Sequence, residues 1–149
     1  MAGDLKNGRT VHSLSTLLAN LGVKFYLVSP EALAMPPEIV SQLAGRGVQM
    51  VVTSDLADAL AHSDVLYMTR IQKERFTDPA EYERLKNSYV LNAALLAGAK
   101  PGLTILHPLP RVDEIARDVD PYEGAAYFRQ AANGVPVRMA LLALVTGQE

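Results

Sequence analysis

Short apolar runs alternate with segments of helical spacing along this chain, and this alternation restricts the possible folds more than any other feature. The apolar runs lie at residues 23–29, 48–52, 64–68 and 103–107. Short runs of this length in which apolar residues predominate are typical of parallel strands that are buried on both faces. We therefore expect a strand at each run, with helices between the strands.

The segments between the runs carry the helical pattern. Apolar side chains recur at helical spacing from Val11 to Leu21, and Pro36 and Pro37 are typical of a helix start. Further helices are expected within residues 55–62, 78–87, 92–98 and 138–147. The pattern predicts an α/β fold, a three-layer twisted parallel sheet with helices on both faces and right-handed crossovers. Because ligands bind such sheets beyond the carboxyl ends of the strands, the loops at those ends are candidate sites.

Composition limits the partners of the chain. At 149 residues, 49% hydrophobic and 20% charged, it is sized for one compact domain at residues 1–149. Fourteen Lys and Arg against sixteen Asp and Glu give a net charge of −2, which provides no basic field for nucleic acid or a membrane surface. Without cysteine it has neither a disulfide framework nor a thiolate site, and no signal peptide or membrane-spanning run is visible. We expect a cytoplasmic protein.

The first candidate loop runs from Gly3 to Thr10 and reads GDLKNGRT, a near-match to the phosphate-binding pattern G-x-x-x-x-G-K-[ST]. Arg9 replaces the lysine, and no acidic residue ends a later strand to bind magnesium, so a nucleotide-binding loop is the weaker interpretation. Arg9 is expected in the first turn of a helix, where the macrodipole disfavours a cation by about 0.3–1 kcal/mol. A bound anion would offset that cost; a solvated arginine is the alternative.

The second candidate loop follows the third apolar run and reads RIQKER, residues 70–75. An exposed run of charges is one interpretation. Its position favours another, because a guanidinium directly after a buried strand is suited to bidentate recognition of a carboxylate or phosphate. Gln72 adds a donor and an acceptor, and Glu74 is expected to hold Arg75 or Lys73 in place.

The third candidate loop, HPLPR at residues 107–111, follows the last apolar run. Its two prolines fix the backbone, which leaves carbonyl groups free to face a ligand. A purely structural turn is the alternative. The remaining histidines have simpler interpretations: His12, in the first expected helix, is expected to pack or to form a hydrogen bond, and His62 is expected on the surface. Tyr127, together with the two residues after it, is expected in the core or in an interface.

Four motifs in this order resemble one enzyme family. They are GDLKNGRTVHSL, DVLYMTRIQKER, HPLPRVDEI and YFRQAANG, and together they extend over essentially the whole chain. On these motifs the chain is similar to the Rossmann-like aspartate-binding half of the aspartate carbamoyltransferases, which join carbamoyl phosphate to L-aspartate in pyrimidine synthesis. Ornithine carbamoyltransferases share the fold, but the ammonium group of ornithine would gain nothing from Arg70 and Lys73 beside it. The resemblance therefore implies a dicarboxylate substrate.

The resemblance also implies roles for individual residues. Arg9 would bind the α-carboxylate of aspartate, and Arg70 and Gln72 its side-chain carboxylate. The backbone carbonyls of Pro108 and Leu109 would accept hydrogen bonds from the carbamoyl amide group and from the substrate amine. The residues expected to support the site are Thr10, Lys73, Glu74, Arg75, His107, Pro110 and Arg111.

By the same resemblance, the Leu109–Pro110 peptide bond would be cis, and the segment from Arg70 to about Tyr82 would close over the substrates. Neither a metal nor another cofactor is expected, and no residue is assigned as catalytic with certainty. The rate would depend on positioning of the reactants and on stabilisation of developing charge.

The family's Ser-Thr-Arg-Thr phosphate loop occurs nowhere in residues 1–149. We therefore expect the carbamoyl-phosphate-binding domain to be absent and the chain alone to be inactive. The resemblance also implies that the complete enzyme is a homotrimer. In the family the final helix packs on that domain, which would explain the apolar residues within 138–147. A noncatalytic aspartate-binding or regulatory module is the second hypothesis.

Overall fold

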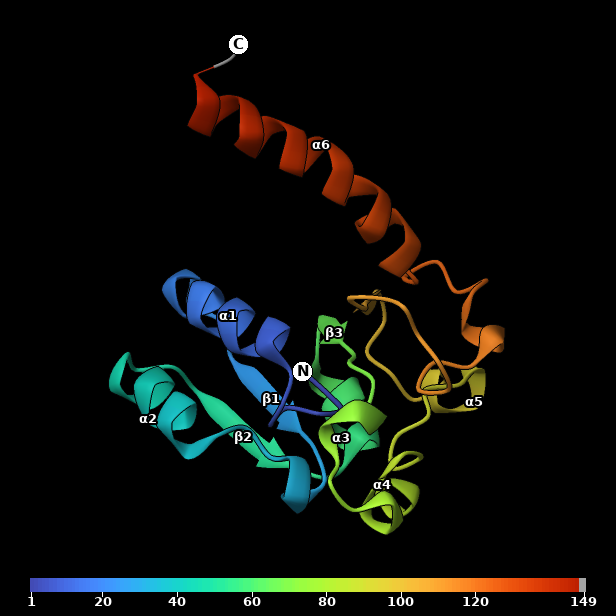
Figure 1. Ribbon diagram of the computed structural model, residues 1–149. Coiled ribbons are helices and arrows are strands. Elements are labelled where there is room, and N and C mark those ends of the chain that lie inside the picture. The colour runs from blue at the N-terminus through green and yellow to red at the C-terminus, as the bar shows by residue number, and fades with distance from the viewer. Residues whose placement is uncertain (148–149) are drawn as a thin grey trace.

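The computed structural model describes residues 1–147. The helices are α1 (Arg9–Leu18), α2 (Pro37–Gly45), α3 (Leu56–His62), α4 (Pro79–Leu85), α5 (Ala93–Leu96) and α6 (Tyr127–Thr146), and the strands are β1 (Phe25–Val28), β2 (Met50–Thr53), β3 (Val65–Tyr67) and β4 (Thr104–Leu106). Single turns of 3-10 helix lie at Ala19–Leu21, Glu31–Leu33, Lys73–Arg75 and Arg117–Val119. A strand or helix is present at each expected place, although the strands are shorter than predicted and the final helix, expected within 138–147, already begins at Tyr127 (Figure 1).

The strands are parallel, as predicted, but the sheet is joined through a residue outside them. β1 pairs with β2, and β3 pairs with β4. Ala2 lies between the two pairs and forms parallel bridges to Val28 and Met68. Its amide donates to the carbonyl of Tyr67 at 2.9 Å, and the amide of Thr69 donates to the Ala2 carbonyl at 2.8 Å. The order is therefore β2–β1–Ala2–β3–β4, and the loop after Ala2 leaves from the middle of the sheet (Figure 1).

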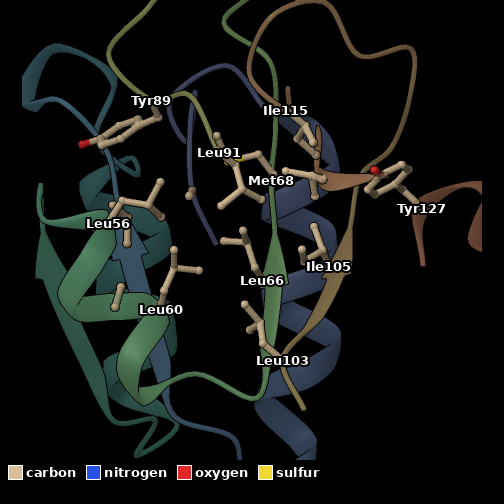
Figure 2. Packing of buried hydrophobic residues seen from close by; sticks show 14 residues of the cluster. Leu56, Leu60, Leu66, Met68, Tyr89, Leu91, Leu103, Ile105, Ile115 and Tyr127 are labelled. Carbon is tan, nitrogen blue, oxygen red and sulfur yellow. The ribbon is translucent and has the colours of Figure 1, made fainter. Parts of the chain in front are cut away.

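Hydrophobic residues pack on both faces of the sheet and confirm the predicted three layers. Phe25 and Leu27 of β1 point into one core, where they meet Val11 of α1 and Leu43 of α2. Val28, whose side chain lies on the opposite face of β1, belongs to the other core. That core, shown in Figure 2, contains Leu56 and Leu60 of α3 together with Leu66, Met68, Leu91, Leu103, Ile105, Ile115 and Tyr127.

Polar side chains set the starts of the short helices beside the sheet. The side chain of Asp55 accepts a hydrogen bond from the amide of Asp58 at 3.0 Å and caps α3. The side chain of Asp78 accepts from the amide of Ala80 at 2.9 Å, and Pro79 occupies the first position of α4. Such a cap typically stabilises a helix by about 0.5–2 kcal/mol. The starts of α3 and α4 are therefore encoded locally.

The expectation that every strand is buried on both faces was wrong for β2 and for the start of β3. Val52 in β2 is 64% exposed, and Val65 in β3 is 50% exposed. β2 lies at the edge of the sheet, and Val52 is the register partner of Leu27, so its side chain lies on the face where α1 and α2 pack. An edge strand has a neighbouring strand on one side only, so its apolar side chains can be less covered than those of a central strand, and the apolar run alone did not reveal the exposure.

α6 extends away from the rest of the fold (Figure 1). Its first residue, Tyr127, is fully buried, whereas most of its large apolar side chains are exposed. These are Phe128, Val135, Val137, Met139, Leu141, Leu142, Leu144 and Val145. The predicted excess of apolar surface on the final helix is thus confirmed. Among residues 1–147, no helix combines the length and the hydropathy needed to cross a membrane.

Candidate functional site

The three predicted loops meet beyond the carboxyl ends of the strands and line one hollow of about 280 Å³, here called the three-loop hollow. The predicted binding and supporting residues that line it are Arg9, Thr10, Arg70, Gln72, Arg75, His107, Pro108, Leu109 and Pro110. The predicted supporting residues outside the lining are Lys73, Glu74 and Arg111. Folding therefore brings together all the side chains and carbonyl-bearing residues that were predicted to contact a substrate.

The lining also includes residues that were not predicted, among them Asp4 and Asn7. Asp4 is 1% exposed. Its carboxylate accepts hydrogen bonds from the backbone amide of Asn7 at 2.9 Å and from the side-chain amide at 3.1 Å. The Asp-x-x-Asn spacing, which is typical of a turn held by an aspartate side chain, is a signal that could have identified this pair. Asp4 thereby shapes the first loop.

Gly3 lets the first loop lie against the second. Its φ of 113° lies in the region that favours glycine, and a Cβ at this position would be 2.1 Å from the carbonyl oxygen of Thr69. Thr69 follows β3 and also lines the three-loop hollow. A side chain at position 3 would therefore separate the two loops that carry Arg9 and Arg70.

Arg9 is the first residue of α1, as predicted, and its side chain is exposed. The first turn of α1, which the structure describes in full, contains no acidic residue. The Arg9 guanidinium therefore places a positive charge at the start of α1, where the free backbone amide groups already carry partial positive charge. This arrangement favours an anion in the three-loop hollow.

Arg70 is paired, and its partner differs from the prediction. Its Nη2 donates to Oε1 of Glu74 at 2.6 Å, so the prediction that Glu74 holds Arg75 or Lys73 was wrong. Residues 73–75 form a 3-10 turn, in which sequence neighbours point in different directions and a residue four positions away is within reach. Hydrogen bonds from its own backbone amide and from the guanidinium lower the pKa of Glu74.

Lys73 fastens the second loop to α4. Its ammonium lies 5.9 Å from the centre of the Tyr82 ring, and Phe76 packs edge-to-face on the same ring at 5.6 Å. Such a cation–π contact at the surface is worth about 0.5–1 kcal/mol. Lys73 thus contributes to the segment that supports Arg70 and Gln72, and its charge lies away from the three-loop hollow.

The third loop is held from inside by His107, which is 2% exposed. Its Nδ1 accepts a hydrogen bond from the amide of Leu109 at 2.8 Å, so the proton of the neutral ring lies on Nε2. Nε2 is 2.7 Å from Oε1 of Glu114, a residue that was not predicted; the Glu114 carboxylate also accepts from the amide of Val112 at 3.2 Å. The Leu109–Pro110 bond is cis, as predicted.

Glu114 is ionised in this environment. Burial raises the pKa of its carboxyl group, but the hydrogen bonds from His107 and from backbone amides outweigh burial, and the net shift is downward. The Glu114 side chain is only 8% exposed. A buried carboxylate is stable in such a place only when donors surround it, which the imidazole and the amides of the third loop provide.

Two contacts tie the third loop to the start of α6. The amide of His107 donates to Oε1 of Gln130 at 3.0 Å. Arg111 binds both oxygens of Asp120, at 2.5 and 2.7 Å, and the hydroxyl of Tyr127 donates to the same carboxylate. The hydrogen bonds from Arg111 and Tyr127 lower the pKa of Asp120 to about 2. Burial and the neighbouring carboxylate raise the pKa of Tyr127 to about 12.

The other two histidines lie outside the three-loop hollow and match their predictions. Nε2 of His12 lies 2.7 Å from the carbonyl oxygen of Leu5, so His12 forms a hydrogen bond within the first loop region. His62 is exposed at the end of α3, where its Nδ1 lies 2.8 Å from the carbonyl oxygen of Asp58. Both side chains have a local structural role.

The charged lining suits a ligand with two negative charges. Arg9, Arg70 and Arg75 contribute three guanidinium groups to the three-loop hollow, and the carboxylate of Asp4 in the same lining is bonded to Asn7. The chain as a whole carries a net charge of −2, so this concentration of cations is local. Guanidinium groups bind carboxylates with paired, charge-assisted hydrogen bonds.

Comparison with known proteins gives one consistent family. The family described as "Aspartate/ornithine carbamoyltransferase, Asp/Orn binding domain" matches residues 1–145. The aspartate carbamoyltransferase catalytic subunit of Thermococcus gammatolerans is 56% identical over 147 residues, which are 99% of this chain and 48% of the relative. That of Chromobacterium violaceum is 53% identical over 147 residues, again 99% and 48%. The chain spans about half the length of the curated relatives it matches.

Solved structures agree with the sequence comparison. The catalytic subunit of M. jannaschii aspartate transcarbamoylase superposes with a TM-score of 0.87 at 47% identity, covering 98% of this chain and 48% of that one. Aspartate transcarbamoylase from Trypanosoma cruzi in complex with carbamoyl phosphate and aspartate has a TM-score of 0.86 at 43% identity, covering 95% of this chain and 47% of that one.

Proposed function

This chain belongs to the aspartate/ornithine carbamoyltransferase family, and we propose that its three-loop hollow binds L-aspartate for transfer of the carbamoyl group from carbamoyl phosphate. The products are N-carbamoyl-L-aspartate and phosphate. The observation that carries the proposal is the convergence of Arg9, Arg70 and Gln72 with the turn of Pro108 and Leu109 on one hollow. The names of the relatives, aspartate carbamoyltransferase catalytic subunits, support it.

Two arginines divide the carboxylates of aspartate between them. Arg9, beside the amide groups at the start of α1, binds the α-carboxylate. Arg70 and Gln72, on the second loop, bind the side-chain carboxylate. A hydrogen bond to a charged group contributes about 1.5–3 kcal/mol, so losing either arginine weakens binding strongly. Thr10 and Arg75, which also line the hollow, support these two anchors.

The same charges select aspartate over ornithine within the family. Ornithine carries an ammonium group where aspartate carries its second carboxylate. Placing that ammonium beside Arg70 and Arg75 in a partly enclosed hollow is unfavourable, because like charges repel and neither is fully solvated. A site for ornithine would need an acidic or neutral lining at this point.

The reaction depends on placing two substrates correctly. The uncharged amine of aspartate attacks the carbamoyl carbon, a C–N bond forms, the C–O bond to phosphate breaks, and the amine passes a proton to the departing phosphate. Negative charge develops first on the carbamoyl oxygen and then on the departing phosphate. The carbonyls of Pro108 and Leu109 accept hydrogen bonds from the carbamoyl amide group and from the amine, which aligns them for attack.

The segment from Arg70 to about Tyr82 closes over the bound substrates in this proposal. It carries Arg70 and Gln72 on one side and is fastened to α4 through Lys73 and Tyr82. Closure excludes water and strengthens the electrostatic contacts inside the hollow. A second domain supplies the site for carbamoyl phosphate, and the complete enzyme is a cytoplasmic homotrimer that needs no metal.

The test uses a hybrid enzyme, in which this chain is joined to the part of the Thermococcus gammatolerans catalytic subunit that it does not cover. We expect the hybrid to form carbamoyl aspartate and to leave ornithine unreacted. Arg70→Ala should lower kcat/KM for aspartate by roughly 10- to 100-fold. Arg46→Ala, which removes an exposed arginine at the end of α2, is the matched control and should leave the rate unchanged.

The other hypotheses predict different results in the same experiment. Aspartate or succinate binding by the hybrid without carbamoylation of any amino acid would indicate a noncatalytic module. Carbamoylation of ornithine would contradict the proposed substrate. Calorimetric binding of magnesium ATP, abolished by a change in the Gly3–Thr10 loop, would favour the nucleotide-binding interpretation of that loop.

A further inference from the structure

Glu114 lies outside the lining of the three-loop hollow, yet its carboxylate organises the turn that contributes Pro108 and Leu109 to it. One carboxylate oxygen is 2.7 Å from Nε2 of His107, and the other accepts from the amide of Val112 at 3.2 Å. Two elements of the turn, the imidazole at its start and an amide near its end, therefore converge on one side chain.

The burial of Glu114 calls for an explanation. Its side chain is 8% exposed, and the side chain of His107, which contacts it, is 1% exposed. Placing a carboxylate in such a position is unfavourable unless every lone pair finds a donor, and an apolar residue would fill the space at lower cost. The carboxylate therefore contributes more than packing at this position.

The imidazole of His107 links the Glu114 carboxylate to the backbone amide of Leu109 through its two ring nitrogens. Because Glu114 accepts from Nε2, the proton stays on that nitrogen, and Nδ1 remains free to accept from the amide of Leu109 at 2.8 Å. The other tautomer would point an N–H group at that amide, and two donors cannot bond to each other. The hydrogen bond that fixes Leu109 thus depends on where Glu114 holds the proton.

We propose that Glu114 is a positioning residue, which acts through the His107 tautomer to hold Pro108 and Leu109 in place for the carbamoyl group and the substrate amine. This inference rests on the proposed function, since those two residues are assigned to the reacting groups there. Arg9 and Arg70 are held by other elements, so carboxylate binding does not depend on Glu114.

Two variants of the hybrid enzyme separate positioning from folding. Glu114→Ala removes the acceptor, and we expect kcat to fall by about 100-fold, the effect of misplacing reactants by about 1 Å, while succinate affinity stays unchanged. Glu114→Gln keeps an oxygen that can accept from Nε2, so most of kcat should return. Long-range proton–nitrogen NMR correlation should show His107 protonated on Nε2 in the wild type and in Glu114→Gln.

Tyr89→Phe is the matched structural control. Tyr89 is 9% exposed, and its hydroxyl donates to the carbonyl of Ser54 at 3.1 Å, away from the three-loop hollow. Its loss should lower the melting temperature and leave kcat and the His107 tautomer unchanged. A Glu114→Ala enzyme that behaves in the same way would overturn the proposal.

The outcomes also separate this inference from the proposed function. If Glu114→Ala does not fold, Glu114→Gln decides: His107 protonated on Nδ1 with kcat unchanged would contradict the inference, whereas Nε2 protonation with most of kcat retained, or loss of Nε2 protonation together with kcat, would support it. Equal losses of kcat and succinate affinity would assign Glu114 a general structural role instead. A wild-type hybrid without carbamoyl aspartate synthesis would refute the proposed function, whereas the NMR measurement tests the tautomer independently.

Discussion

The guanidinium of Arg70 and the carboxylate of Glu74 form an ion pair of 2.6 Å at the start of the second loop. The contact uses one terminal nitrogen of Arg70, and the guanidinium has further N–H groups that remain free to bind a substrate carboxylate. The ion pair with Glu74 therefore orients the Arg70 guanidinium beside the three-loop hollow and leaves its other N–H groups available for a ligand.

This relationship gives the first prediction. Glu74→Gln should weaken aspartate binding by about two- to fivefold, the range expected for losing one exposed pair, because Arg70 then samples more conformations. The melting temperature of the hybrid enzyme should hardly change. Calorimetric titration with succinate measures the affinity, and an increase in affinity would show that Glu74 competes with the ligand instead.

Arg9 is predicted to lower the stability of the ligand-free protein and to strengthen the binding of a dicarboxylate. A cation at the start of a helix is unfavourable by about 0.3–1 kcal/mol, so Arg9→Ala should raise the stability of the ligand-free protein by that amount and weaken succinate binding at least tenfold. Arg46, at the end of α2, is the matched residue, because a cation is favourable there. Denaturant unfolding should show opposite effects for Arg9→Ala and Arg46→Ala.

The Asp120 carboxylate should make the stability of the folded protein depend measurably on pH in the acidic range. Its pKa falls from 3.8 to about 2 in the folded protein, because Arg111 and Tyr127 donate to the ionised form. The stabilisation is therefore fully present only well above the unfolded-state pKa of 3.8 and is lost as the pH falls toward the folded-state pKa of about 2. Thermal unfolding should show wild type more stable than Asp120→Asn at pH 7, with the difference vanishing near pH 2. A constant difference would contradict the assignment.

Gly3 should tolerate no side chain. Gly3→Ala would place a Cβ 2.1 Å from the carbonyl of Thr69 at a φ of 113°, so it should destabilise the protein by more than about 1 kcal/mol and lower aspartate affinity. Gly45, in the last turn of α2, is the control, because a Cβ there meets nothing within 4 Å. Gly45→Ala should stabilise the helix by about 0.5–1 kcal/mol.

Sequence alone was sufficient for the elements and for their general arrangement. The alternation of apolar runs with helical spacing predicted the parallel sheet with helices on both faces, since periodicity records which faces of a segment avoid water. The rule for the carboxyl ends of parallel strands then placed Arg9, Arg70, Gln72 and Leu109 at one edge, and the structure brings them to one hollow.

Only the tertiary structure decided which groups pair. Ala2 alone forms the bridge between β1 and β3, and a single residue shows no apolar periodicity from which this pairing could have been predicted. Glu74 pairs with Arg70 because a 3-10 turn sets its direction, and Glu114 reaches His107 because the turn between them folds back. A hydrogen bond needs two groups within about 3 Å, and that distance is fixed by the folded backbone, which apolar patterns do not encode.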